Sequence, residues 1–313
     1  MSAKKIRVLL LGFALAAATG LVVVSWTDPP GSTEAGAWVT RAPTGPAPRT
    51  PGADVSTAPD APPGTDDAAG RIPGATRPGS VPPVVDHGPR TGNKVALTFD
   101  ADMTDGMLYQ LRTGQVRSYA NLRIIDLLER EQLAATFFLT GKWVERYPDL
   151  TRRLAGNPRF ELANHTYGHL AFTADCYGLP RIARNEMTRD VERTFELVEA
   201  YGGRQTRYFR FPGLCHDGPA LAALAPLGAT VVDGDVVSGD PFAEAWRPIV
   251  DAVLSKVKPG SVIVMHVTEA NAPMTDEALP HILAGLAERG LVPATLSEVL
   301  RDGDDQAESE STQ

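Results

Sequence analysis

The central part of the chain alternates between short apolar runs and segments in which apolar residues recur every three or four positions. Short apolar runs of this kind are typical of buried strands. They cover residues 95–99, 135–139, 159–163, 207–211, 229–232, 261–265 and 291–294.

The intervening segments predict amphipathic helices, because their apolar residues share one face at helical spacing. Strand and helix in alternation predict parallel βαβ units, so the expected fold class is α/β. About seven strands in one domain favour a deformed (β/α) barrel over an open doubly wound sheet. The helical segments are marked by Leu122, Ile125, Leu128 and Leu133; by Trp143, Leu150 and Leu154; by Val191, Phe195, Leu197 and Val198; by Ile249, Val253 and Val257; and by Leu279, Ile282, Leu283 and Leu286.

The N-terminal end follows neither pattern. Lys4, Lys5 and Arg7 precede an uncharged apolar stretch, so residues 1–26 are predicted to be a cleaved signal peptide or a retained membrane anchor, and both alternatives stay open. The basic residues should remain inside the cell. We therefore expect a protein that is secreted or anchored to the outer face of the cytoplasmic membrane.

Residues 27–92 are rich in Pro, Gly, Ala, Thr and Ser. They predict a disordered linker, because this composition cannot bury enough apolar surface to offset chain entropy. An alternative is that residues 81–85 pack as an added strand. Residues 302–313 are acidic without compensating bases, which predicts a disordered, solvated tail. The folded domain is therefore expected to span residues 93–301.

Composition and charge exclude several classes of function. The 313 residues carry 30 Lys and Arg against 38 Asp and Glu. This acidic balance, without a long basic block, makes nucleic acid an unexpected partner. Two cysteines are too few for a Cys-based zinc site, so any metal must be held mainly by His and carboxylate.

Polar residues gather where the predicted strands end. In β/α barrels the residues just past the C-terminal ends of the strands meet at one rim and form the active site. In chain order these residues are Asp100, Ala101 and Asp102; Asn164, His165 and His169; Arg210, Pro212 and Gly213; Asp235 and Asp240; and His266.

His165 and His169 are four residues apart, a spacing that places two imidazoles on one helical face, where they can hold one metal ion. Two histidines on a solvated turn are the alternative. A zincin protease is excluded because Thr166 stands where its glutamate is required. Asp100, Asp102 and Asp105 offer a carboxylate for a two-His-one-Asp site. A calcium-like or purely turn-forming acidic loop is the alternative, although the spacing does not match an EF-hand loop.

The ordered motifs resemble a known family. Thr-Phe-Asp at 98–100, Asn-His-Thr at 164–166 with His169, Arg-Phe-Pro-Gly at 210–213, an Asp-rich turn and an apolar strand ending in His266 resemble the polysaccharide deacetylases of carbohydrate esterase family four, the NodB-homology domain. The resemblance covers about residues 94–300. It implies a deformed β/α barrel and the metal-dependent removal of acetyl groups from N-acetylated sugars in chitin-like glycans or peptidoglycan, or from O-acetylated xylan.

The resemblance also implies roles for individual residues. Asp100 matches the catalytic base, Arg210 matches the arginine that orients it, and His165 and His169 match the two metal-binding histidines. The family's metal-binding aspartate directly follows the base, and here that position is Ala101.

The missing aspartate leaves two candidates for the third metal ligand. We assign this role to Asp102, one residue further on, with Asp105 as the second candidate. A carboxylate displaced by one residue points in a different direction from the end of a strand, so its geometry has to be checked.

Three further roles follow from the same resemblance. Gly213 stands where the family often has Tyr and would supply a backbone N–H to the oxyanion. Asp240 would hold the catalytic imidazole, although Pro241 replaces the usual Trp after it. His266 matches the general acid, although Val267 replaces the usual Asp after it.

Cys176 and Cys215 follow the second and third motifs, whose loops should share one rim. In an oxidising compartment we expect them to form a disulfide, with two unpaired thiols as the alternative. His87, His216 and His281 fit no motif and are expected at the surface.

The sequence is thus interpreted as a secreted or membrane-tethered, metal-dependent polysaccharide deacetylase with a polysaccharide substrate and zinc as the expected ion. A catalytically impaired glycan-binding relative is the main alternative, suggested by Ala101 and Val267. A non-haem iron oxygenase would use the same ligand types, but the chain has no closely spaced His-x-Asp pair.

Overall fold

The computed structural model describes residues 72–301. The predicted signal or anchor segment at 1–26, most of the predicted linker and the predicted tail at 302–313 lie outside these residues. None of the helices within 72–301 is long and apolar enough to cross a membrane.

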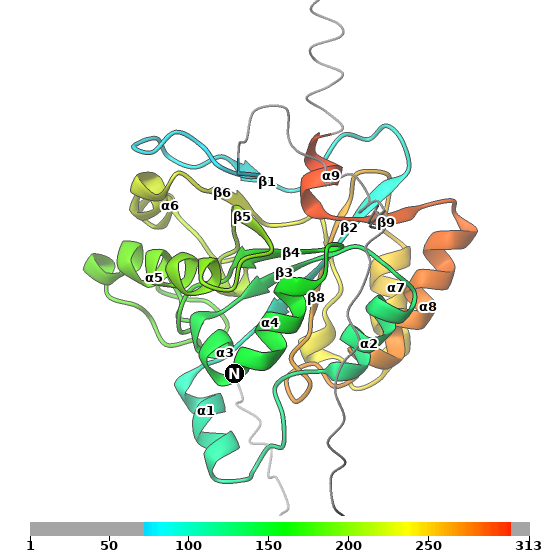
Figure 1. The fold of residues 1–313 in the computed structure, drawn as a ribbon, viewed down its shortest axis with the longest axis horizontal. Helices are drawn as coiled ribbons and strands as arrows, with labels where there is room; N and C mark the ends of the chain where they lie inside the picture. Colours follow the sequence, from blue (N-terminus) through cyan, green and yellow to red (C-terminus); the bar gives the residue numbers. More distant parts are fainter. Residues whose placement is uncertain (1–71, 302–313) are drawn as a thin grey trace, which may run out of the picture. The chain divides into compact units, whose positions relative to one another are not determined.

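The core of the domain is a sheet of nine strands in the order β1-β6-β5-β4-β3-β2-β8-β7, with β9 beside β2. All pairings between these strands are parallel. Each of the seven predicted runs corresponds to a strand. The order has two free ends, so the structure confirms a deformed barrel and shows that it stays open (Figure 1). The strands are β1 (Val84–Val85), β2 (Lys94–Ala101), β3 (Ala135–Leu139), β4 (Phe160–Asn164), β5 (Arg204–Phe209), β6 (Thr230–Val232), β7 (Val236–Val237), β8 (Val262–His266) and β9 (Val292–Ala294).

The predicted helices are present as α2, the pair α3 and α4, α5, α7 and α8. The second predicted helix is divided because Tyr147 precedes Pro148, and a residue before proline is disfavoured in helical conformation. Three further helices, α1, α6 and α9, were not predicted. The helices are α1 (Asp105–Arg112), α2 (Leu122–Arg130), α3 (Gly141–Arg146), α4 (Pro148–Gly156), α5 (Met187–Glu199), α6 (Gly218–Leu224), α7 (Trp246–Leu254), α8 (Thr275–Glu288) and α9 (Leu296–Arg301).

Strand β2 shows how the barrel separates an outer core from an inner one. Val95, Leu97, Phe99 and Ala101 belong to the largest hydrophobic cluster, whereas Ala96 belongs to a second cluster inside the barrel. Alternate residues of a strand point to opposite faces. Asp100 therefore shares its face with Ala96 and not with the outer core.

Helix α9 closes one end of the barrel. Its Leu296 and Val299 join the inner cluster with Phe138 and Tyr208, and the Leu296 N–H donates to Oγ1 of Thr136 near the start of β3 at 3.0 Å. In Figure 1, α9 and α1 lie at opposite ends of the domain. Helix α9 therefore covers the N-terminal ends of the strands, and the polar residues lie at the C-terminal ends.

The prediction of a linker up to residue 92 is wrong at its C-terminal end. Residues 84 and 85 pair with Val231 and Val232 of β6, so the alternative of an added strand is right for these two residues. Pro73 O accepts the Arg207 N–H at 2.7 Å, and Pro83 O accepts the Val231 N–H at 2.9 Å. Proline lacks an N–H but can still accept, which suits it to a sheet edge. The domain therefore includes residues 72–92.

Candidate active site

The C-terminal ends of β2, β4, β5 and β8 bring the predicted site residues together. Asp100 lies in β2, and Asp102 follows one residue after its end. Because Ala101 points into the outer core, Asp100 and Asp102 point to the other face, as residues two apart do in extended chain. Both carboxylates approach Nε2 of His165, at 3.8 and 3.4 Å.

Asp102, His165 and His169 form a compact group whose ligand atoms all lie within 4.8 Å of one another. Oδ1 of Asp102 lies 3.4 Å from Nε2 of His165 and 3.3 Å from Nε2 of His169. All three residues are buried. The structure therefore places Asp102 beside the two imidazoles, one position beyond the expected aspartate.

Asp105, the second candidate ligand, lies outside this group. Its side chain is 84% exposed and its Oδ1 accepts from Nζ of Lys142 at 2.6 Å. An exposed carboxylate that pairs with a lysine is not available to a buried ion. The geometry therefore favours Asp102.

The expectation that His165 and His169 lie on one helical face is wrong. They belong to a loop after β4 in which Thr166 and His169 have φ values of 71° and 55°, a left-handed conformation that is uncommon outside glycine. Asn164 Oδ1 accepts the Thr166 N–H at 2.9 Å, and Asp190 Oδ1 accepts the Tyr167 N–H at 2.7 Å. The loop, rather than a helix, brings the two imidazoles to the same point.

The protonation of the histidines is consistent with a bound cation. Nδ1 of His165 lies 2.9 Å from the carbonyl oxygen of Arg210, which can only accept, so Nδ1 donates to this oxygen and Nε2 is left facing Asp102. Burial lowers the pKa of His169 to about 4, which leaves this imidazole neutral near neutral pH.

Oδ1 of Asp102 is buried and accepts no hydrogen bond within the described residues. Burial alone would raise the pKa of this carboxyl, but the neighbouring imidazoles, His169 and His266 foremost, hold the pKa well below its ordinary value. A buried, ionised oxygen without a hydrogen-bond donor is unfavourable unless a cation lies beside it. The residues therefore fit a divalent metal ion, and their donor set suits zinc.

Asp100 is held by Arg210. Nη1 of Arg210 donates to Oδ1 of Asp100 at 2.6 Å, and its Nε donates to the Val232 carbonyl at 3.1 Å. Arg210 is fully buried and its guanidinium lies 4.0 Å from the centre of the Phe138 ring inside the barrel. This pair leaves Oδ2 of Asp100 facing His165 and the candidate metal site.

His266 and Asp240 form a second pair. Nδ1 of His266 donates to Oδ1 of Asp240 at 2.8 Å, and Nε2 of His266 lies 3.7 Å from Oδ2 of Asp102. Burial alone would lower the pKa of His266, but the charges of Asp240 and Asp102 outweigh burial and raise the pKa to about 10. Burial would likewise raise the pKa of Asp240, and the charge of His266 lowers it instead.

Four residues that hold the site were missed from the sequence. Thr275 Oγ1 and Ser238 Oγ donate to the two oxygens of Asp240 at 2.7 and 2.8 Å. Asn271 Nδ2 donates to Oδ2 of Asp102 at 3.2 Å, and Thr268 Oγ1 accepts the Asp102 N–H at 3.1 Å. Single hydroxyl and amide residues of this kind have no spacing pattern that would identify them before the fold is known.

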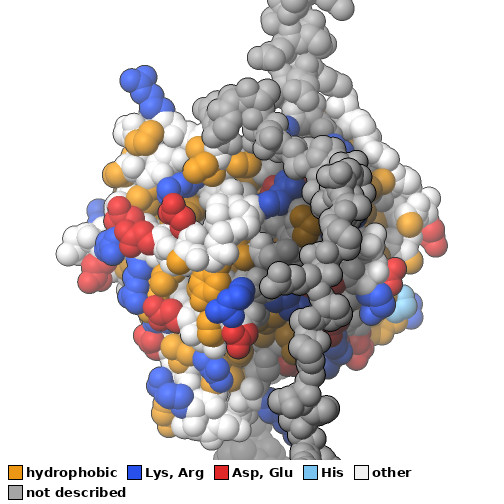
Figure 2. Space-filling view, in the orientation of Figure 1, with side chains coloured by type: hydrophobic (Ala, Val, Ile, Leu, Met, Phe, Trp, Pro, Cys, Tyr) orange, Lys and Arg blue, Asp and Glu red, His pale blue; other side chains and the backbone are white. Residues whose placement is uncertain are grey.

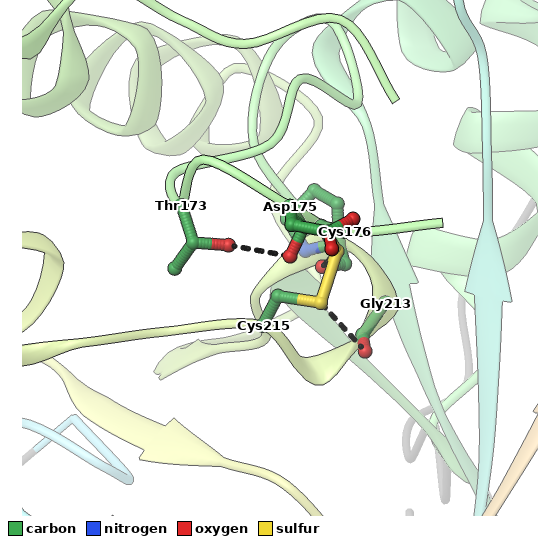
Figure 3. The surroundings of a disulfide bond; sticks show 6 residues. Thr173, Asp175, Cys176, Gly213 and Cys215 are labelled. Carbon is green, nitrogen blue, oxygen red and sulfur yellow. Dashed lines mark hydrogen bonds between the residues drawn. A yellow bond between two sulfur atoms is a disulfide. The ribbon is translucent and has the colours of Figure 1, made fainter. Parts of the chain in front are cut away.

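Gly213 lies in a single 3-10 turn (Pro212–Leu214) just after Arg210. Its φ is +60°, and a Cβ atom at this position would lie 2.7 Å from Sγ of Cys176. Cys176 and Cys215 form a disulfide, with their Cα atoms 6.0 Å apart. Figure 3 shows that the bridge joins the loop of Thr173 and Asp175 to the loop of Gly213.

Of the remaining histidines, His87 and His281 are exposed. His216 is not a simple surface residue, because its side chain is 19% exposed and its Nε2 lies 2.9 Å from Oδ2 of Asp233. Asp235 also has a structural role, since its Oδ1 accepts the Val262 N–H at 2.8 Å at the start of β8. On the face shown in Figure 2, acidic and basic side chains are interspersed and form no basic patch.

The domain is therefore an open parallel β/α barrel. Its rim carries a candidate metal site, the Asp-His-His group, and a separate His-Asp pair. The family model described as polysaccharide deacetylase matches residues 87–232. The matched region therefore belongs to the polysaccharide deacetylase family, as the motifs predicted.

Individual relatives are distant. A chitooligosaccharide deacetylase of Sinorhizobium fredii is 28% identical over 56% of this chain and 83% of its own length. The chain covers only 52% of another relative, the uncharacterised protein YlxY of Bacillus subtilis.

Solved structures share the fold. The Bc1960 peptidoglycan N-acetylglucosamine deacetylase is 24% identical, with a TM-score of 0.59 over 70% of this chain and 92% of the other. BA3943 of Bacillus anthracis, described as a family-four pseudoenzyme, is 21% identical, with a TM-score of 0.56 over 70% of this chain and 69% of the other.

Proposed function

We propose that this protein is a metal-dependent hydrolase that removes acetyl groups from N-acetylated sugars of a polysaccharide such as peptidoglycan or a chitin-like glycan. The observation that carries the proposal is the buried Oδ1 of Asp102, which lacks a hydrogen-bond donor and faces Nε2 of His165 and of His169 at 3.4 and 3.3 Å. The names of the deacetylase relatives support the choice of substrate.

A divalent cation, most simply Zn²⁺, held by these three residues would polarise the acetyl carbonyl and lower the pKa of water. Asp100 would accept a proton from the attacking water through Oδ2. Arg210 orients Asp100 through its hydrogen bond to Oδ1. The backbone N–H of Gly213 is the proposed donor to the oxygen that gains negative charge.

His266 would act as the general acid. Asp240 accepts the proton on Nδ1 of His266, which fixes the ring and leaves Nε2 facing the site. Nε2 would donate its proton to the sugar nitrogen as the carbon–nitrogen bond breaks, so that acetate and a free amine result. A general acid or base of this kind contributes about 10²–10⁴ in rate.

A catalytically impaired glycan-binding protein is the second candidate. Its support is the fold shared with BA3943 and the presence of Ala101 and Val267 where the family has aspartates. The position of Asp102 beside both histidines favours an active enzyme over this alternative.

Acetate release from N-acetylglucosamine oligomers and from acetylated peptidoglycan tests the proposal. Turnover should require added zinc and stop with a chelator, and Asp100→Asn should lower kcat by about 10²–10⁴. His266→Ala should lower kcat to a similar extent, while circular dichroism of both variants stays unchanged. Absence of acetate release from every substrate, with the oligomer still bound, would establish the glycan-binding alternative.

We also propose that the protein works outside the cytoplasm, with residues 1–26 as a signal peptide or membrane anchor. The Cys176–Cys215 disulfide supports this location, because disulfides persist in oxidising compartments. Fractionation of the source cells, followed by N-terminal sequencing of the mature chain, distinguishes the two alternatives. Recovery of the intact chain in the cytoplasm with reduced cysteines would contradict the proposal.

A further inference from the structure

Two aromatic side chains at the rim of the barrel contribute to neither the core nor the proposed chemistry. Tyr177 is 72% exposed and Phe242 is 74% exposed, which makes them the most exposed large apolar side chains within residues 72–301. Their ring centres lie 5.8 Å apart at an angle of 34°. Single exposed apolar residues are normal on protein surfaces, but a contacting pair of exposed rings from two separate loops indicates a binding surface.

The pair borders the proposed active site on two sides. Phe242 ends the single 3-10 turn Asp240–Phe242, whose first residue holds His266. The ring of Tyr177 lies against Gly213, because a Cβ atom built on Gly213 would be 2.9 Å from the Tyr177 ring. Tyr177, in the loop between β4 and α5, therefore packs against the loop that follows Arg210 and meets Phe242 of the turn that carries Asp240.

The disulfide fixes the position of Tyr177. The neighbouring Cys176 is bridged to Cys215 and is only 4% exposed, and Sγ of Cys215 lies 3.4 Å from the Gly213 carbonyl oxygen (Figure 3). Tyr177 itself has a φ of 51°, a conformation that is unfavourable for a bulky residue unless its surroundings hold it. Gly213 leaves the space that the bridge and the ring occupy.

From this arrangement we propose that Tyr177 and Phe242 form a sugar-binding platform, held in place by the Cys176–Cys215 disulfide. Its ligand is a pyranose ring of the same glycan chain, next to the sugar whose acetyl group is removed. Pyranose rings present C–H faces that pack on aromatic rings, and binding sites combine such surfaces with a few polar groups. The inference rests on the proposed function, because it assigns the polymer backbone of that substrate to this surface.

The test compares a long substrate with a short one. Tyr177→Ala and Phe242→Ala should each lower kcat/KM for an N-acetylglucosamine tetramer by about 3- to 10-fold, through KM, and should lower kcat/KM for the N-acetylglucosamine monomer by a smaller factor. Tyr177→Phe keeps the ring and should behave as wild type. Tyr109→Ala removes an aromatic ring of α1 that is 56% exposed and should have no effect on tetramer turnover.

Replacing both cysteines, Cys176→Ser with Cys215→Ser, tests the role of the disulfide. If this double variant does not fold, the tetramer KM of Tyr177→Ala tests the platform instead. The folded double variant should show the same KM increase for the tetramer as Tyr177→Ala. Calorimetric titration of the tetramer into wild type and Tyr177→Ala gives a second readout that needs no turnover.

The outcomes separate the two proposals. Normal turnover with an unchanged tetramer KM in both alanine variants overturns the platform and leaves the deacetylase function intact. Tetramer binding that falls in Tyr177→Ala, without acetate release by the wild type, supports the platform and overturns the deacetylase function. Failure of the wild type to bind the tetramer overturns the platform.

Discussion

The position of Asp102 shows how side-chain alternation decides the site at the scale of single residues. Ala96, Asp100 and Asp102 are an even number of residues apart and share the inner face of β2 and its continuation, while Phe99 and Ala101 pack into the outer core. An aspartate at position 101 would therefore have to leave that core to reach the histidines. A carboxylate at 102 reaches them without such a change.

This geometry predicts different effects for the two candidate ligands. Asp102→Asn should abolish stoichiometric zinc binding, because it removes the charged oxygen shared by His165 and His169. Asp105→Asn should leave zinc binding and kcat unchanged, because Asp105 lies at the surface beside Lys142. Zinc content after gel filtration, measured by atomic absorption, checks both variants. Loss of zinc in Asp105→Asn would contradict the assignment.

At the residue scale, the sequence identified the candidate site residues but not the residues that hydrogen-bond to them. Asp100, His165, Arg210 and His266 could be predicted because they follow strands and match ordered motifs. Thr275 could not, because it reaches Asp240 from the start of α8, 35 residues further along the chain, and such a contact depends on tertiary packing.

Among the elements, the loop between β4 and α5 carries two of the three candidate metal ligands, His165 and His169. The four-residue spacing correctly predicted that His165 and His169 lie close together, but it predicted a helix. In the structure, two residues in left-handed conformation bring the two imidazoles together in a turn. The turn is anchored to the start of α5, where Asp190 accepts the Tyr167 N–H at 2.7 Å. Burial raises the pKa of the Asp190 carboxyl. This partly buried acid holds the turn through its hydrogen bond to Tyr167.

Asp190→Ala should therefore lower both stability and zinc affinity. The Tyr167 N–H loses its acceptor, at a cost of about 1–3 kcal/mol in the free energy of unfolding, and zinc should bind about 10-fold more weakly. Asp190→Asn keeps an acceptor oxygen and should recover most of both effects. Glu192→Ala, on the exposed side of α5 beside Arg189, should change stability by less than about 1 kcal/mol. Urea denaturation and competitive zinc titration measure the two quantities, and equal losses in the alanine variants at 190 and 192 would exclude the anchoring role.

Strands were easier to predict than short helices. The seven predicted runs are apolar and of strand length, whereas β1 and β7 have two residues each, too few to produce a pattern. Helix α1 has eight residues and none of them is fully buried. Its Met107, Leu108 and Leu111 pack only partly against the outer core, which is too short an apolar stripe to identify a helix.

For the whole molecule, the boundary of the domain depends on contacts that composition does not reveal. Residues 72–92 resemble a linker in composition, yet Thr76 N–H donates to Gly228 O at 2.9 Å and Gly88 N–H donates to Gly260 O at 2.8 Å. Through these hydrogen bonds, residues 72–92 cover the edge of β6 and the turn before β8. Two of the prolines that suggested disorder, Pro73 and Pro83, occupy positions where a carbonyl acceptor is needed.

A chain that starts at residue 72 should therefore be more stable than one that starts at residue 94. Deletion of residues 72–93 uncovers the edge of β6 and leaves the Val231 and Asp233 N–H groups without their acceptors, Pro83 O and Val85 O. Each lost bond costs about 0.5–1.5 kcal/mol. Thermal unfolding followed by circular dichroism compares the two chains, and an identical Tm would show that this segment does not contribute to the domain.

The candidate metal centre joins side chains from two of the strand ends, so metal binding should stabilise the whole domain. Zinc that binds only the folded state at about 100 times its Kd adds about 2.7 kcal/mol to the free energy of unfolding, which corresponds to roughly 5–10 °C in Tm for a domain of this size. Chelator-treated protein should therefore melt at a lower temperature and recover when zinc is restored. Asp102→Asn should show no such recovery, because the ionised oxygen between His165 and His169 is missing. An equal zinc-dependent shift in this variant would mean that the stabilising ion binds elsewhere in the chain.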